Sequence, residues 1–253
     1  MPEQARLNWY FMAFSVSKFS DADLRDLEAE LSRMAALVEK QLLGAINAFE
    51  RRDVAAAEKL IPVDQRLDEY DRDIETRVMA MLEKATMPKE MLRQVMTIMK
   101  VTGELERVGD LAKNVAKRTL VVSREVPARP TLGVARMGRA SLRQFSDILN
   151  AYATQNLEAA KAVWGGDDEL DELYNSVFQE ILLAMMKDSD RVNACTHLVF
   201  IAKNFERVGD HATNIAEAIH FQVTGSPLVE IRPKGDETSS ITVEPPKRTG
   251  ASS

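Results

Sequence analysis

The five-residue segment Glu-Arg-Val-Gly-Asp occupies residues 106–110 and returns unchanged, 100 residues later, at residues 206–210. Upstream of it the shift becomes 103 residues and pairs a second set of positions: Asp64, Leu67, Asp68 and Glu69 with Asp167, Leu170, Asp171 and Glu172. The three-residue difference falls near residues 86–88, beside a proline, where a loop between helices tolerates a deletion. The chain therefore contains one unit of about a hundred residues twice.

Apolar residues recur every three or four positions in each unit, a spacing typical of helices with one buried face. This spacing predicts helices over residues 21–50, 62–84 and 88–121 in the first unit and over residues 131–154, 167–186 and 188–223 in the second. Asp21 is expected to cap the first helix, and Pro62 suits the first turn of the second. Residues 53–61 are interpreted as a short connection. The predicted fold is all-α, with two tandem pseudo-symmetric three-helix bundles.

The predicted domain boundaries follow from the repeat. Residues 19–122 form the first bundle, residues 123–130 a linker containing Pro127 and Pro130, and residues 131–224 the second bundle. Residues 1–18 match nothing later in the chain and are interpreted as a flexible arm or an annotation artefact. Their apolar run is shorter than the roughly 20 residues that cross a bilayer. Residues 225–253, rich in Pro, Ser, Thr, Gly and charge, are predicted to be a disordered tail.

The overall charge and the cysteine content limit the class of protein. The net charge is −6 and the sequence pI is about 5.3. A nucleic-acid partner would require a basic face, so no nucleic-acid ligand is expected. The single cysteine, Cys195, has no partner for an internal disulfide, which favours a reducing compartment. A cytoplasmic protein is therefore expected.

Four pairs of acidic residues stand four positions apart, a spacing that places both members on one face of a helix. They are Asp64 with Asp68, Glu106 with Asp110, Asp167 with Asp171, and Glu206 with Asp210. Like charges at this spacing cost about 0.2 to 0.5 kcal/mol per pair, and bound cations would offset that cost. Carboxylates without His or Cys suit hard cations, and iron, manganese or magnesium are the expected metals. If the second and third helices of a bundle pack side by side, four carboxylates converge.

Gly109 and Gly209 lie between the acidic residues of the third-helix pairs. A glycine inside a helix costs about 1 kcal/mol relative to alanine, and its missing side chain lets another helix or a ligand approach closely. An alternative interpretation is structural, because Arg107 and Arg207 are three positions from Asp110 and Asp210 and suit ordinary surface ion pairs. The exact repetition of the motif favours the metal interpretation.

Other sites are less well supported by the sequence. His211 adjoins the second motif, but its counterpart in the first unit is Leu111, so His211 cannot serve a role that both units share. The Glu-x-x-His pattern of ferritin-like oxidases is missing, because glycine occupies the third position after Glu106 and Glu206. The sequence contains no Gly-rich phosphate loop, no G-x-S-x-G elbow and no Cys-x-x-Cys.

The repeated motifs at residues 106–110 and 206–210, with the acidic pairs that precede them, resemble those of the PhoU family over about residues 20–224. The resemblance implies two pseudo-symmetric three-helix bundles whose acidic motifs bind metal clusters. It also implies a repressor of the phosphate-starvation response that acts at the inner membrane with two partners, the PstB-like ATPase subunit of the phosphate transporter and a PhoR-like sensor histidine kinase. A homodimer is expected as well.

Three hypotheses remain open at this point. The leading one is a non-enzymatic signalling adaptor that contacts the transporter and the kinase. The second is a carboxylate-bridged, metal-dependent hydrolase or oxidase, and the third is a purely structural helical dimerisation protein. An enzyme requires an acid or base in an enclosed pocket, whereas an adaptor can carry its carboxylates on an open face.

Overall fold

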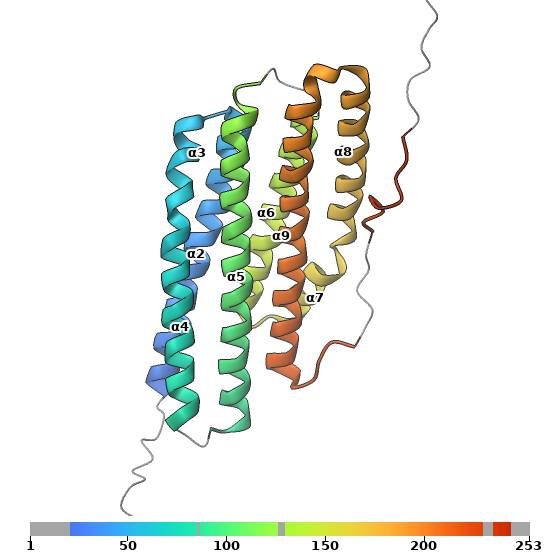
Figure 1. Ribbon diagram of the computed structural model, residues 1–253. Helices are drawn as coiled ribbons and strands as arrows, with labels where there is room; N and C mark the ends of the chain where they lie inside the picture. The colour runs from blue at the N-terminus through green and yellow to red at the C-terminus, as the bar shows by residue number, and fades with distance from the viewer. Residues whose placement is uncertain (1–20, 85–86, 126–129, 230–234, 244–253) are drawn as a thin grey trace, which may run out of the picture.

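The computed structural model describes residues 21–84, 87–125, 130–229 and 235–243, and within these ranges the chain contains helices and no strand (Figure 1). The first half comprises α2 (Asp21–Arg51), α3 (Val54–Leu60), the 3-10 helix η1 (Ile61–Val63), α4 (Asp64–Lys84) and α5 (Lys89–Val122). The second half comprises α6 (Thr131–Ala153), α7 (Leu157–Gly165), α8 (Asp168–Lys187), η2 (Ser189–Arg191) and α9 (Val192–Thr224). The predicted all-α class is confirmed. The predicted arm, residues 1–18, lies outside the described residues.

The long helices begin and end within a few residues of the predicted bounds, but the sequence interpretation missed α3 and α7. Each of these short helices starts at a polar cap: Asp53 Oδ1 accepts from the backbone N–H of Ala56 at 2.9 Å, and Asn156 Oδ1 accepts from Ala159 at 3.0 Å. Before each cap the chain turns through a residue with positive φ, Arg52 at 55° or Gln155 at 51°. These turns occupy equivalent positions in the two halves, so the repeat extends to the details of the backbone.

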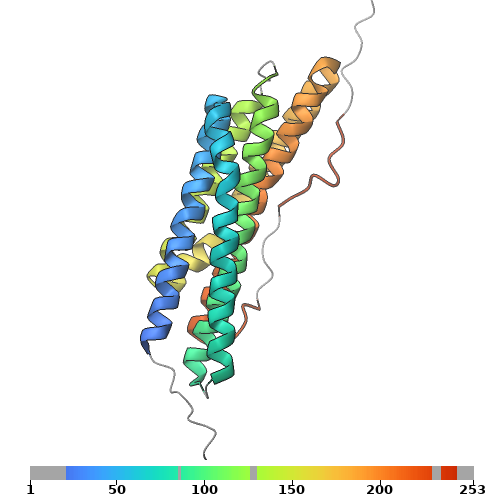
Figure 2. The same ribbon diagram turned by 60° about the vertical axis from the view of Figure 1, so that its left-hand side comes forward.

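The two halves pack against each other through antiparallel pairs of equivalent helices. The most extensive contact joins α5 to α9, and α2 packs on α6 (Figures 1 and 2). In the first pair, Thr97 Oγ1 lies 3.5 Å from the carbonyl oxygen of Ala218, and an Arg118 guanidinium nitrogen lies 3.3 Å from Nδ1 of His197. The two pairs are equivalent, because in the repeat Thr97 corresponds to His197 and Ala218 to Arg118. The contact between the halves is therefore pseudo-twofold symmetric.

One polar contact in the same interface breaks that symmetry. His211 Nδ1 on α9 lies 2.6 Å from Oε2 of Glu104 on α5, and the Asn214 amide donates to the same oxygen at 3.0 Å. Burial alone would raise the pKa of Glu104, but the hydrogen bonds from His211 and Asn214 lower it below its ordinary value. His211 thus joins the two halves, which explains why its counterpart Leu111 need not be polar.

One continuous apolar core runs through both halves. Phe205 on α9 is fully buried, and its ring lies against Gly138 on α6, where Ile46 of α2 also approaches. The counterparts of Phe205 and Gly138 in the first half are Leu105 and Ala35, so a larger side chain faces a smaller one in the second half. The predicted domain boundaries remain a prediction, although the helices on either side of them share this core. No helix of the described ranges is apolar and long enough to cross a membrane.

Candidate metal centre

The acidic pairs of each half form one acidic face where the second long helix packs on the third, α4 on α5 and α8 on α9. The first acidic face comprises Asp64, Asp68, Glu106 and Asp110, and the second comprises Asp167, Asp171, Glu206 and Asp210. Gly109 and Gly209 permit this close packing. A Cβ atom at Gly109 would lie 2.3 Å from Cδ1 of Leu67, and one at Gly209 would lie 2.6 Å from Cδ2 of Leu170. Leu67 and Leu170 are equivalent, and each follows an acidic residue of the predicted site by three positions. Because these leucines fill the space beside Gly109 and Gly209, the two glycines set the distance between the acidic helices of each half.

In the first half a lysine joins the two helices. Lys113 Nζ donates to Asp64 Oδ2 at 2.5 Å and to Asp110 Oδ1 at 2.6 Å. Burial raises the pKa of the Asp64 carboxyl, and the Lys113 ammonium opposes that rise. Although burial alone would lower the pKa of Lys113, its hydrogen bonds to Asp110 and Asp64 raise it. Lys113 therefore stands where a cation is expected between these carboxylates.

The remaining carboxylates of the first face are more open to solvent. Asp68 is exposed and Glu106 is half-buried. Burial and, next, the charge of Asp110 raise the pKa of Glu106, and the carboxylates of Asp71 and Asp68 act in the same direction. The alternative interpretation expected Arg107 to pair with Asp110. In the structure Asp110 pairs with Lys113, whereas the largely exposed Arg107 has its Nε 3.8 Å from Glu106 Oε2.

In the second half the equivalent face is buried. Asp167, Asp171 and Glu206 are 2%, 5% and 5% exposed, and Asp210 is half-buried. The Gln144 amide donates to Asp167 Oδ1 at 2.9 Å, and Lys203 Nζ donates to Glu206 Oε1 at 2.8 Å. The other oxygen of Glu206, Oε2, is buried and has no hydrogen-bond partner among the described residues. Burial raises the pKa of Glu206 to about 7.

These residues have the chemistry that a hard cation prefers, although their side chains do not surround one point. Among the described residues no three Asp, Glu, His or Cys side chains stand close enough together to hold a metal ion. The predicted convergence of four carboxylates in each half is therefore not seen. In the first half Lys113 stands between Asp64 and Asp110, and in the second Lys203 stands beside Glu206. The unsatisfied oxygen of Glu206 suits a cation, since a buried carboxylate oxygen without a partner is costly. The eight predicted ligands remain a prediction.

The structure adds residues that the sequence interpretation missed. Lys113 and Lys203 stand three positions after Asp110 and three before Glu206, so their spacing was a usable signal. Asp71 follows Asp68 by three positions, a spacing that places it on the same face of the helix. Asp236 lies in the segment predicted to be disordered, yet its Oδ2 accepts from Lys203 Nζ at 2.9 Å. Nothing in the sequence pattern points to that contact.

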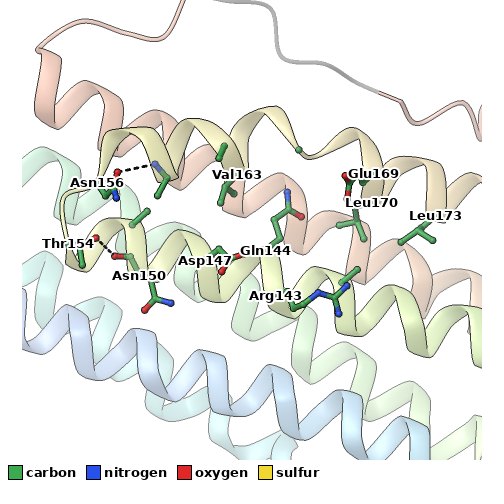
Figure 3. A pocket seen from close by; sticks show the side chains of 15 residues that line it. Arg143, Gln144, Asp147, Asn150, Thr154, Asn156, Val163, Glu169, Leu170 and Leu173 are labelled. Atoms are coloured by element: carbon green, nitrogen blue, oxygen red, sulfur yellow. Dashed lines mark hydrogen bonds between the residues drawn. The ribbon is translucent and has the colours of Figure 1, made fainter.

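A groove of about 630 Å³ lies beside the second acidic face, between α6, α7 and α8 (Figure 3). Arg143, Asp147 and Glu169 give its lining charges of both signs. Gln144 and Leu170 also line the groove. The Gln144 amide donates to Asp167, and both side chains lie close to Gly209. The groove and the acidic face therefore share part of their walls.

The fold and the two acidic faces define a class of duplicated helical-bundle proteins with carboxylate-rich helix pairs. Residues 31–119 and 134–219 each match the PhoU domain, and the chain belongs to the PhoU family. Among its relatives is the "Phosphate-specific transport system accessory protein PhoU homolog" of Caulobacter vibrioides (strain NA1000 / CB15N), which is 42% identical over 86% of this chain and 95% of its own length. The protein of the same name from Rhizobium meliloti (strain 1021) is 37% identical over 87% and 94% of the two chains.

Solved structures agree with this assignment. The crystal structure of PhoU from Pseudomonas aeruginosa superposes with a TM-score of 0.79 at 29% identity, covering 81% of this chain and 99% of that one. The crystal structure of the phosphate transport system regulatory protein PhoU from Streptococcus pneumoniae gives a TM-score of 0.75 at 26% identity, covering 82% and 98%. Membership of the family and its helical-bundle fold, both inferred from the repeated motifs, are confirmed.

Proposed function

We propose that the chain is a regulatory accessory protein of phosphate transport. It acts in the cytoplasm beside the inner membrane and represses the phosphate-starvation response when phosphate is plentiful. The main support is its likeness to relatives named as accessory proteins of the phosphate-specific transport system, which extends over nearly their whole length. It contacts the PstB-like ATPase subunit and the PhoR-like kinase as a homodimer, without turning over a substrate.

Deleting the gene tests this function directly. In a strain without a paralogue, phosphate-starvation genes should be expressed in phosphate-rich medium, because no adaptor then couples the transporter to the kinase. Transcript levels measure the effect, and the restored wild-type gene should repress them again. A pull-down from membranes should recover the ATPase subunit with the wild-type chain. Normal repression in the deletion strain would contradict the proposed role.

We further propose that each half holds a hard cation through its own carboxylates: Asp64, Asp68, Glu106 and Asp110 in the first half, and Asp167, Asp171, Glu206 and Asp210 in the second. The support is the chemistry of the donor set and the unpartnered buried oxygen of Glu206. The cation would neutralise like charges on packed helices and thereby fix their spacing. Iron, manganese and magnesium all suit such oxygen ligands.

Removing one carboxylate from each face should lower the metal content in steps. Asp110→Asn and Asp210→Asn should each reduce the metal bound per chain, and the double variant should lose more than either, because each change removes a charged ligand from a different face. Elemental analysis of the purified proteins measures the content. Asp190→Asn, at an exposed position in η2, serves as the control. The assignment is wrong if the double variant keeps the full stoichiometry.

A further inference from the structure

Residues 235–238 lie against the second acidic face, beside α8 (Figure 1, dark red). The backbone N–H of Gly235 donates to Asp171 Oδ2 at 2.8 Å. The amide of Asn175 donates to the carbonyl oxygen of Gly235 at 2.6 Å, and its oxygen accepts from the N–H of Glu237 at 3.0 Å. One side chain of α8 therefore holds the segment by both a backbone acceptor and a backbone donor.

Charge holds the same segment to α9. Lys203 Nζ lies 2.8 Å from Glu206 Oε1 and 2.9 Å from Asp236 Oδ2, and 5.0 Å from the centroid of the Tyr174 ring. Asp236 is itself held by Thr238, whose N–H and hydroxyl donate to Asp236 Oδ1 at 2.9 and 2.6 Å. The lysine thus joins a carboxylate of the acidic face to a carboxylate of the C-terminal segment.

Gly235 lets the segment approach α8 closely. A Cβ atom at this position would lie 3.2 Å from Cβ of Asp171 and 3.7 Å from the carbonyl oxygen of Asp168, and the first of these distances is tighter than an ordinary contact. A larger side chain would move the N–H of residue 235 away from Asp171. The seating therefore depends on glycine followed by aspartate, a specific sequence and not merely a polar one.

Three of the residues that seat the segment differ between the two halves, whereas Asp171 has an identical counterpart, Asp68. Tyr174, Asn175 and Lys203 correspond to Asp71, Arg72 and Gly103 in the first half. An arginine cannot accept from a backbone N–H, and a glycine cannot join two carboxylates. The first acidic face consequently lacks three of the groups that hold residues 235–238 on the second.

We propose that residues 235–238 are a built-in cover that competes with metal cations for the second acidic face. In the covered arrangement Gly235 engages an oxygen of Asp171, and the Lys203 ammonium stands beside Glu206, where a cation would bind. A cation that takes both carboxylates must displace this hydrogen bond and repel the ammonium, so the cover must leave. The competition rests on the proposed metal role, whereas the seating of the segment does not.

The competition is tested by titrating Mn²⁺ into metal-free full-length chain by calorimetry. The comparison proteins are a chain ending at Val229 and the variant Asn175→Ala. Because the whole segment no longer opposes the cation, Mn²⁺ should bind the second face of the truncated chain about tenfold more tightly or better. Asn175→Ala removes two of the segment's hydrogen bonds and should also tighten Mn²⁺ binding, by a smaller factor. Arg72→Ala, at the equivalent position of the first half, is the matched control and should change nothing. Equal or weaker Mn²⁺ binding after removal of the cover would overturn the proposal.

Hydrogen exchange separates failure of the cover from failure of the metal role. Without metal, the amides of Gly235 and Glu237 should exchange slowly in the wild type and at least tenfold faster in Asn175→Ala and Gly235→Val. Adding Mn²⁺ to the wild type should speed their exchange. Fast exchange in the metal-free wild type would overturn the cover itself. Slow exchange together with no Mn²⁺ binding by any variant would retain the seated segment but overturn the metal role and with it the competition.

Discussion

Replacing Phe205 by alanine is expected to lower the free energy of unfolding by about 3 to 5 kcal/mol, the range found when a buried aromatic ring is removed. The ring is fully buried where α9 meets α6 and α2, and its neighbour Gly138 has no side chain that can move into the space left behind. Chemical denaturation followed by the circular dichroism signal of the helices measures the change.

The control is Phe200→Ala on the same helix. Phe200 is 47% exposed, and its ring lies 4.0 Å below the guanidinium carbon of Arg118, so its loss should cost about 1 kcal/mol or less. Because one core joins the halves, Phe205→Ala should shift a single transition. If only part of the helix signal moves, the halves unfold separately, as the repeat alone would suggest. A cost below that of Phe200→Ala would contradict the packing described for Phe205.

Gly209→Ala is expected to destabilise the chain by about 1 to 3 kcal/mol through overpacking, even though alanine favours a helix interior by about 1 kcal/mol. A Cβ atom there would lie 2.6 Å from Leu170 Cδ2, 2.8 Å from Asp167 Oδ1 and 2.9 Å from Gln144 Oε1. Three groups on two neighbouring helices would have to move at once. The free energy of unfolding, measured without metal, reports this cost.

Gly103→Ala provides the matched comparison. Gly103 also lies inside a long helix, but a Cβ atom at this position would meet no neighbouring group within 4 Å. That change should stabilise the chain by about 0.5 to 1 kcal/mol. Opposite signs for the two glycines would show that Gly209 is needed for close packing. Stabilisation by both substitutions would mean that α8 can move away from α9 without loss.

The repeat and the apolar spacing were sufficient to predict the architecture, because long helices with one buried face follow from local pattern. The helices α3 and α7 were missed because seven and nine residues carry too few turns to show a period. Their signals are instead the caps Asp53 and Asn156, each three positions before the amide that it accepts from. A search for capping residues before alanine-rich segments would have found both.

The candidate site was predicted only in part. The acidic pairs are visible because their spacing is local to one helix. The spacing of Lys113 from Asp110 and of Lys203 from Glu206 is local as well, but the contact of Lys113 with Asp64, 49 positions away, depends on packing between helices and had no sequence signature. The contact of Asp236 with Lys203 joins a core helix to a segment of polar composition. Composition predicts little burial for such a segment, but it does not exclude a few specific hydrogen bonds.

The antiparallel pairing of α5 with α9 places α4 and α8 on opposite flanks of the bundle (Figure 1). The two acidic helix pairs are therefore separated by a rigid spacer instead of a flexible tether. A larger assembly that engages both flanks would gain avidity, since the second contact forms within an existing complex at a high effective concentration. The gain is available only to assemblies whose two binding sites are spaced to match the two flanks of the bundle. The width of the α5–α9 pair therefore determines which assemblies can bind both flanks at once.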